Sequence, residues 1–294
     1  MEDLKQYLKE RAKEVDAALD AYLPAARTRP GTIHKAMRYS LFAGGKRLRP
    51  ILTLAAAEAC QGDIEEAMPS ACAVELMHTY SLVHDDLPCM DDDDLRRGRP
   101  TCHKVFGDNI AVLAGDALLT EAFIVLAQSS PTRRYPMAAF VAELAITGGS
   151  TKLIGGQVLD LEGEGKDLTK AQLIRIHEAK TAALLTSSIR LGAMSANATP
   201  ARLEALTIFG YNLGLAFQVI DDILDVTQTT EKLGKTAGKD EAVAKATYPA
   251  VLGLEKARKE AHRYTDKAMA ALKPFGRKAL HLRQIAEYLL ERDY

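Results

Sequence analysis

Residues 80–91, YSLVHDDLPCMD, pass from an aromatic residue through an apolar stretch into two adjacent aspartates. Residues 217–228, FQVIDDILDVTQ, repeat this order later in the chain and also reach an aspartate pair. The apolar residues around each pair indicate helices that are largely buried. The weak internal similarity predicts two related helices whose acidic ends face one cavity.

The rest of the sequence is typical of a helical protein. Ala and Leu are frequent, Trp is absent, and few stretches alternate polar and apolar residues as a strand would. Residues 51–60, ILTLAAAEAC, are apolar all round, which indicates a central buried helix. No stretch is rich enough in Ser and Gly to be a flexible linker. We therefore predict an all-α fold, with one domain over residues 1–294 and a bundle of ten or more helices around a central cavity.

Three short patterns mark where helices begin. Asp63 with Glu66 has the form of an N-cap residue followed by an acid at the third helical position. Thr169 with Gln172 has the same form, and Pro200 stands at a favourable first helical position. We expect helices to begin at all three places.

Composition excludes several classes of protein. The 294 residues carry 38 basic and 39 acidic side chains, so no overall positive charge points to nucleic acid. Four scattered cysteines without a CxxC pair are typical of a reduced, cytoplasmic protein. The first residues are charged, and no uninterrupted apolar run of about 18 residues occurs, so we expect neither a signal peptide nor a membrane span.

The second acidic motif, DDxxD, consists of Asp221, Asp222 and Asp225. On a helix, residues four apart share a face, so Asp221 and Asp225 point the same way. Carboxylates on one face of a buried helix repel one another unless a cation lies between them. Because an oxygen-only donor set suits Mg²⁺, all three aspartates are candidate metal ligands.

The first motif, DDxxxxD, contains the candidate ligands Asp85, Asp86 and Asp91. Pro88 interrupts the helix between them, and the two extra residues allow the chain to bulge and bring Asp91 back beside Asp85. A calcium-binding EF-hand loop would need a central glycine, which is missing here. The motif therefore predicts a second Mg²⁺-binding face.

Mg²⁺ held by a few carboxylates completes its coordination with substrate phosphates, which need cations nearby. Residues 44–50, GGKRLRP, place a basic cluster after two glycines that permit close approach of the backbone. Further cations are Arg96, Arg97, Lys180, Lys235, Lys239 and Lys245. P-loop and dinucleotide fingerprints are absent from the sequence. His84 with Asp85 leaves a metal-dependent phosphohydrolase of the HD type open as an alternative.

These motifs together resemble the all-trans short-chain isoprenyl (polyprenyl) diphosphate synthases, most closely the bacterial farnesyl diphosphate synthases. The resemblance covers nearly the whole chain. It rests on GGKRLRP (44–50), VELMHTYSLVHDDLPCMDDDDLRRGRPT (74–101), GDALL (115–119), GGQVLDL (155–161), HEAKTAAL (177–184), FQVIDDILDVT (217–227) and GKTAGKDEAVAKATYP (234–249). It implies the isoprenoid synthase fold and a homodimer. DDxxD alone would be less specific, since terpene cyclases also use it.

The resemblance also implies a mechanism in three steps: ionisation of an allylic diphosphate, condensation with isopentenyl diphosphate, and loss of a proton to the departing diphosphate. Three Mg²⁺ would be held by Asp85, Asp91 and Asp221, with Asp86 and Asp225 as ligands or close supports. The allylic diphosphate would contact Arg96, Lys180, Lys235 and Lys245. Isopentenyl diphosphate would contact Lys46, Arg49, His78 and Arg97. Oxygen atoms around Lys180, Thr181 and Gln218 would stabilise the carbocation, while Gln157 and Asp160 are weaker candidates.

Product length is expected to depend on Tyr80 and Ser81, because the growing hydrocarbon must run away from the metals. Tyr80 stands five residues before Asp85, about 7.5 Å along a helix, and its ring would close the cavity. In the family, an aromatic residue at this place accompanies a C15 product. We therefore expect farnesyl diphosphate, with geranylgeranyl diphosphate (C20) as the alternative. A non-catalytic partner subunit is a more distant alternative, although it would be expected to lack one acidic motif.

Overall fold

The computed structural model describes residues 2–227 and 247–290. Nearly all of the ordered secondary structure is helical, as the sequence predicts. The helices are α1 (Glu2–Tyr22), α2 (Gly31–Leu41), α3 (Leu48–Ala59), α4 (Ile64–Asp85), α5 (Cys102–Phe106), α6 (Asp108–Leu126), α7 (Met137–Gly148), α8 (Leu153–Gly163), α9 (Lys170–His177), the π-helical turn η1 (Glu178–Ala182), α10 (Ala183–Ser195), α11 (Pro200–Thr227), α14 (Tyr248–Leu252), α15 (Leu254–Ala271), the 3₁₀ segment η2 (Lys273–Ala279) and α16 (Leu280–Leu290).

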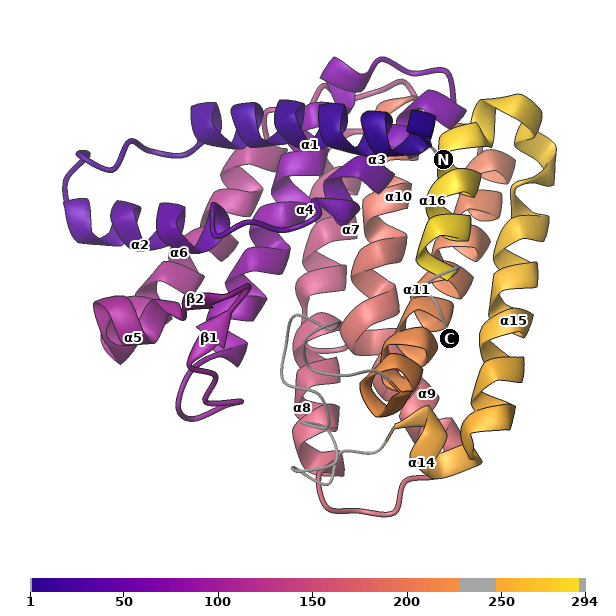
Figure 1. Ribbon diagram of the computed structural model, residues 1–294. Coiled ribbons are helices and arrows are strands. Elements are labelled where there is room, and N and C mark those ends of the chain that lie inside the picture. The colour runs from indigo at the N-terminus through magenta and orange to yellow at the C-terminus, as the bar shows by residue number, and fades with distance from the viewer. Residues whose placement is uncertain (1, 228–246, 291–294) are drawn as a thin grey trace.

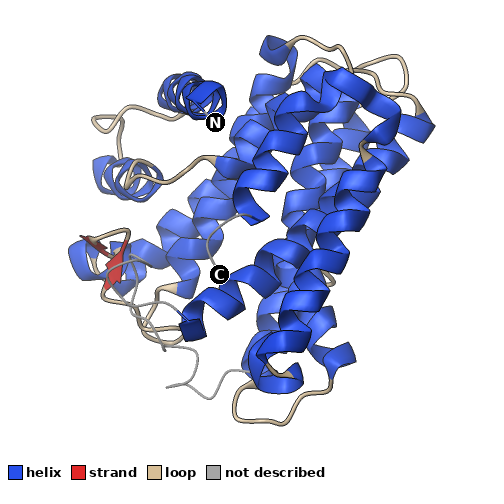
Figure 2. Cartoon of the chain, turned by 45° about the vertical axis from the view of Figure 1, so that its right-hand side comes forward, coloured by secondary structure: helices blue, strands red, loops and turns tan. Residues whose placement is uncertain are grey.

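The helices form one bundle in which α10 is central. Helix α10 contacts α3, α4, α7 and α11, and α11 in turn packs along α15. In Figure 1, α10, α11 and α15 run side by side, whereas α1 crosses one end of the bundle. A second view shows the almost complete dominance of helix and the small strand pair at one edge (Figure 2). The all-α expectation is therefore confirmed.

Local sequence explains where these helices begin. The Asp63 carboxylate accepts a hydrogen bond from the backbone N–H of Glu65 and caps α4. Thr169 and Gln172 form a reciprocal capping box at the start of α9, and Pro200 is the first residue of α11. Helix α3 is buried all round, with Ile51, Leu52 and Leu54 fully inaccessible, so the prediction of a central buried helix is also confirmed.

One feature departs from the expected purely helical chain. The strands β1 (Leu95–Arg96) and β2 (Arg99–Pro100) form a two-stranded antiparallel pair just after the first acidic motif. Arg97 and Gly98 both have positive φ and close the turn between the strands. This hairpin turns the chain back toward α4 and so places the residues that follow the aspartates against the end of that helix.

Three segments are long and apolar enough to cross a membrane by length and composition alone, which the search for uninterrupted apolar runs missed. They are α6, the segment Met137–Gly163 and α11. In the structure, between 28% and 56% of their apolar windows is buried within the bundle. Helix α6 packs against α4 and α2, and α11 packs against α10 and α15. Helices α6 and α11 thus pack within the helical bundle, and the segment Met137–Gly163 is the least buried of the three.

The basic segment 44–50 is anchored by one buried arginine. Arg47 and Glu75 are 3% and 2% exposed and form an ion pair of 2.9 Å between Nη1 and Oε1. Arg47 Nε also donates to Asp16, and its Nη2 donates to the carbonyl oxygen of Leu41. Arg47 therefore ties α1, α2 and α4 together and has a structural role.

We expect Arg47→Met to lower the free energy of unfolding by about 3–5 kcal/mol, because Glu75 would be left buried without its main cation. Urea unfolding followed by circular dichroism measures this loss. The exposed Arg27→Met is the matched control and should change stability by about 0.5 kcal/mol or less. A similar small change for both variants would contradict the anchoring role.

Candidate active site

A cavity of about 410 Å³ opens between α3, α4, α8 and η1. Its polar lining includes Arg49, His78, Asp85, Gln157, Lys180 and Thr181. Its apolar wall includes Leu153, Ile154, Val158 and Leu161 of α8 together with Tyr80 of α4. Charged groups of both signs thus share one space with an apolar wall, as a substrate with an anionic head and a hydrocarbon tail requires.

The first acidic motif begins where α4 ends. Helix α4 stops at Asp85, and the backbone N–H of Asp91 donates to the carbonyl oxygen of Asp85 at 2.8 Å. The loop therefore folds back and brings Asp91 beside Asp85, as predicted from Pro88 and the four-residue gap. Burial raises the pKa of Asp85 to about 6, with Asp91 adding to the rise and Lys180 opposing it. The two carboxylates thus repel one another at the cavity mouth.

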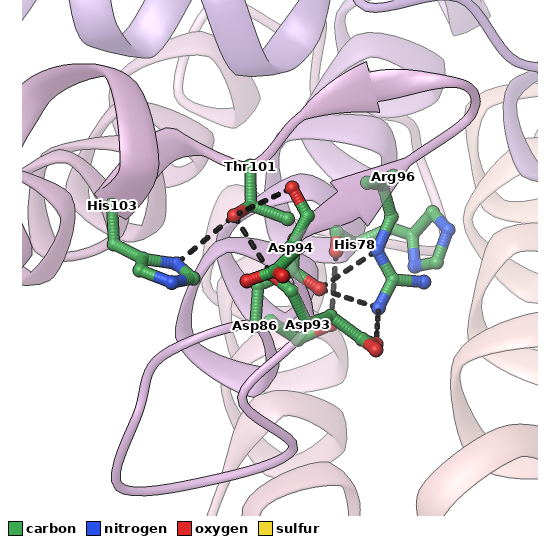
Figure 3. A network of polar contacts seen from close by, with 8 residues as sticks. His78, Asp86, Asp93, Asp94, Arg96, Thr101 and His103 are labelled. Carbon is green, nitrogen blue, oxygen red and sulfur yellow. Dashed lines mark hydrogen bonds and ion pairs between the residues drawn. The ribbon is translucent and has the colours of Figure 1, made fainter. Parts of the chain in front are cut away.

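Asp86 points its carboxylate toward the guanidinium of Arg96 (Figure 3). It is 4% exposed and accepts a hydrogen bond of 2.8 Å from Nε of Arg96. Arg96 also forms an ion pair with Asp93 at 3.3 Å. Burial lowers the pKa of Arg96, but the hydrogen bonds and charge of Asp86 outweigh it and leave that pKa raised. Arg96, expected to bind the allylic diphosphate, is therefore already held by two carboxylates.

The later aspartates of the run attach the hairpin. The Thr101 hydroxyl donates to the carbonyl oxygen of Asp93, and its N–H donates to that of Asp94 (Figure 3). The side chain of Asp94 forms an exposed ion pair with Lys104 at 2.7 Å. The acidic run therefore divides between carboxylates at the cavity and carboxylates that support the loop.

The second acidic motif lies in the last turns of α11. Burial lowers the pKa of the cavity-lining Arg49, and the negative charge of Asp221 opposes this shift, so Asp221 lies near Arg49. Asp222, also a predicted metal ligand, is absent from the cavity lining, as are Asp221 and Asp225. Its Oδ1 accepts from Gln218 at 3.0 Å, and its Oδ2 accepts from the N–H of Tyr248 at 2.9 Å. Asp225 is buried in the same helix. The structure therefore places Asp222 in a support network between α11 and α14.

The residues predicted to bind isopentenyl diphosphate are partly brought together. Burial, assisted by the positive charge of nearby Arg97, lowers the pKa of Arg49 to about 10. Burial also lowers the pKa of His78 well below its usual value, assisted by Arg49 and Arg97. Among the described residues, Nε of Arg49 has no hydrogen-bond partner. Two arginines facing one another in this way are suited to an anion placed between them.

Arg97 and Lys46 occupy the outer part of this basic region. The guanidinium of Arg97 donates to the carbonyl oxygen of Gly44 and lies against Gly45, where a Cβ atom would come within 2.4 Å of its Nη1. The glycine pair thus permits this contact. Lys46 is exposed and lines a separate hollow of about 230 Å³ bordered by α1 and α16.

The predicted Lys180, Thr181 and Gln218 do converge. Lys180 and Thr181 lie in the π turn η1, and both line the cavity. Lys180 Nζ forms an ion pair of 2.6 Å with Asp160 of α8. The Thr181 hydroxyl donates to the side-chain oxygen of Gln218 at 3.0 Å. The π turn, rare in proteins and frequent at functional sites, therefore presents both side chains to the cavity.

Sequence reasoning undervalued the contribution of α8. Asp160 is the ion-pair partner of Lys180, and Oε1 of Gln157 is buried without a hydrogen-bond partner among the described atoms. The spacing of Ile154, Val158 and Leu161 is that of one helical face and could have identified an apolar cavity wall. Lys235, Lys239 and Lys245 lie outside the described residues.

The next question is whether the side chains at the cavity suit the expected Mg²⁺ ions. Within residues 2–227 and 247–290, no three His, Cys, Asp or Glu side chains converge as a closed metal site. Asp85 nevertheless lines the cavity with Asp91 next to it, and the carboxyl pKa of Asp85 is raised to about 6. An oxygen-only, mutually repelling pair open to a cavity fits Mg²⁺ that also uses ligands from a substrate.

The HD-type alternative would need His84 to share a metal with Asp85. Nε2 of His84 instead lies 2.9 Å from the carbonyl oxygen of Val112 on α6. Its ring also stacks edge-on against Tyr80. The histidine therefore ties α4 to α6, and this geometry does not support the alternative.

Comparisons with known proteins agree with the motifs and the cavity. The family model described as polyprenyl synthetase matches residues 30–286. The chain is 50% identical to "Geranylgeranyl pyrophosphate synthase, chloroplastic" of Capsicum annuum, covering 99% of this chain and 79% of the relative. It is 47% identical to "Dimethylallyltranstransferase" of Fischerella ambigua, covering 99% and 84%.

Among solved structures, an FPP/GFPP synthase from Zymomonas mobilis without ligand is similar, with a TM-score of 0.85 and 36% identity. The similarity covers 98% of this chain and 99% of that chain. The match to the family model, the full-length relatives and the shared fold coincide with the paired acidic motifs found here. The chain belongs to the polyprenyl synthetase family.

Proposed function

We propose that this protein is a Mg²⁺-dependent prenyltransferase that condenses isopentenyl diphosphate with allylic diphosphates. The observation that carries the proposal is a single cavity that combines Asp85, Lys180 and Arg49 with an apolar wall. Membership of the polyprenyl synthetase family supports the same reaction class. The more distant alternative of a non-catalytic subunit has no support from the described site, because both acidic motifs are retained.

Different residues of the chain would contact the two substrates. Asp85, Asp91 and Asp221 are the candidate holders of Mg²⁺, which when bound supplies Lewis-acid stabilisation of charge on the leaving diphosphate. Lys180 lies beside Asp85 and can orient the same diphosphate. Arg49, His78 and Arg97 would bind the isopentenyl diphosphate from the opposite side of the cavity. The apolar wall excludes water from the carbocation between them.

The oxygen atoms beside η1 are placed to stabilise that carbocation. The side-chain oxygen of Gln218 and the hydroxyl oxygen of Thr181 stand 3.0 Å apart. Gln218 donates its N–H to Asp222, and this bond fixes the amide so that its oxygen faces Thr181. A fixed dipole of this kind stabilises developing charge without having to reorganise.

The test of the reaction class is condensation by the purified protein with Mg²⁺, an allylic diphosphate and labelled isopentenyl diphosphate. We expect a longer prenyl diphosphate, and Asp85→Asn should lower kcat by roughly 10²-fold or more, because it removes a carboxylate that faces the leaving group. The exposed Asp92→Asn is the matched control and should retain activity. Hydrolysis without condensation, or no turnover by the wild type, would refute the proposal.

For the product we propose geranylgeranyl diphosphate. The name of the Capsicum annuum relative supports a C20 product. Farnesyl diphosphate, expected from the sequence, is the second candidate because Tyr80 lines the cavity and is only 4% exposed. Tyr80 stands five residues before Asp85, about 7.5 Å along α4, and its ring would limit the tail if the tail ran along that helix. A C20 tail would instead pass beside Tyr80 along the apolar face of α8.

Tyr80→Ala separates the two candidates when products are sized by chromatography. For a tail that follows α8, we expect the wild type and Tyr80→Ala to release the same C20 product. A wild type that stops at C15 and a variant that proceeds to C20 would establish the farnesyl candidate and the role of Tyr80. Tyr80→Phe keeps the ring and should match the wild type in either case.

We also propose that the protein is a homodimer. Large apolar side chains are exposed along α6 and α7, among them Leu113 at 53% and Ile146 at 62%. Such a surface is unusual on a monomer and typical of an interface. We expect a dimer by analytical ultracentrifugation and a shift to monomer for Leu113→Glu. The exposed Lys104→Glu lies outside this surface and should leave the dimer intact, whereas a monomeric wild type would refute the proposal.

A further inference from the structure

The π turn η1 lies between two helices that approach its backbone unusually closely. Helix α8 lies on one side of η1 and α11 on the other. A Cβ atom at Gly156 of α8 would stand 2.3 Å from the backbone nitrogen of Lys180. A Cβ atom at Gly214 of α11 would stand 2.6 Å from Cα of Ala182. Because both obstacles are backbone atoms, no side-chain movement could relieve either contact.

Each glycine is followed, one helical turn later, by a polar residue that holds a side chain of the same π turn. Asp160 comes four residues after Gly156 and pairs with Lys180 at 2.6 Å. Gln218 comes four residues after Gly214 and accepts the hydroxyl of Thr181 at 3.0 Å. The backbone position of η1 and the directions of the Lys180 and Thr181 side chains are therefore both fixed by the same faces of α8 and α11.

The geometry of the π turn explains why η1 must be held in place by α8 and α11. Lys180 and Thr181 are adjacent in this turn, and both line the cavity. A π turn carries an extra residue and leaves part of the regular hydrogen-bond pattern unformed. Its placement must therefore come from the neighbouring helices.

We propose that Gly156 and Gly214 are positioning residues for the reaction, acting through Lys180 and Thr181 respectively. Their lack of a side chain sets how deeply the π turn sits between α8 and α11, and hence where these two side chains meet the allylic substrate. This inference rests on the proposed function for its kinetic consequences and on the helix contacts for its structural ones.

The kinetic test is a pair of double-mutant cycles. Gly156→Ala and Gly214→Ala should each lower kcat by roughly 10²-fold, the effect of about 1 Å of misplacement, while KM for isopentenyl diphosphate stays unchanged. In a Lys180→Ala background, Gly156→Ala should cost little more, because its effect is transmitted through the missing side chain. Gly214→Ala should behave likewise in a Thr181→Ala background. The proposal would be overturned if, in both cycles, the loss of kcat in the double variant equalled the product of the losses in the two single variants.

Gly192→Ala is the matched control. Gly192 is also a helical glycine, and its added Cβ would stand 1.9 Å from the carbonyl oxygen of Thr53, away from η1. We expect it to lower Tm while kcat is kept. Should it fail to fold, Gly210→Ala, with a Cβ 2.9 Å from Cα of Thr186, replaces it. If the control lost as much kcat as Gly156→Ala, general destabilisation would explain the effect and the proposal would be overturned.

Hydrogen exchange of the protein without substrates tests the placement independently of activity. Gly156→Ala and Gly214→Ala should speed amide exchange in residues 178–182, whereas the control should not. If the wild type fails to condense substrates, the proposed function falls and this measurement still decides whether the glycines hold the turn. Unchanged exchange in both glycine variants would overturn that claim.

Discussion

The close approach of the helix α9–η1–α10 to its neighbours is the constraint on which the rest of the structure depends. Gly192 lets α10 meet the backbone of α3, and Gly156 and Gly214 let α8 and α11 meet η1. The contacts at Gly156 and Gly214 bring α8 and α11 close enough to η1 for their side chains to bond to it. Larger residues at Gly156 and Gly214 would move these helices away from η1, and the paired groups Lys180–Asp160 and Thr181–Gln218 would no longer reach each other.

The charges of the site follow from what each one faces. Arg47 is neutralised inside the bundle by Glu75, whereas Arg49, two residues later, is buried toward the cavity and its pKa is lowered to about 10. Asp85 shows the converse effect, since burial and Asp91 raise its pKa to about 6. Charged groups in such unfavourable surroundings gain most when a ligand of opposite charge arrives. The cavity is thus prepared for both a cation and an anion.

Sequence patterns predicted the helical class and much of the site because both depend on local spacing. The return of Asp91 to Asp85 followed from Pro88 and a residue count, and the caps at Asp63 and Thr169 followed from short motifs. Other features depend on contacts between distant residues. Asp86 could not be distinguished from Asp85 without knowing where Arg96 lies, and nothing in HEAKTAAL reveals that its helix widens into a π turn.

In both acidic motifs the two adjacent aspartates have different surroundings, which explains why each motif begins with a pair. In both, the second aspartate is 4% exposed and accepts hydrogen bonds from protein donors, Arg96 for Asp86 and Gln218 for Asp222. The first aspartate of each pair influences a charged group at the cavity instead. Neighbours on a helix point about 100° apart, so the two carboxylates of each pair can meet different surroundings. A buried carboxylate needs strong donors, and those donors then fix the end of the helix that presents the first one.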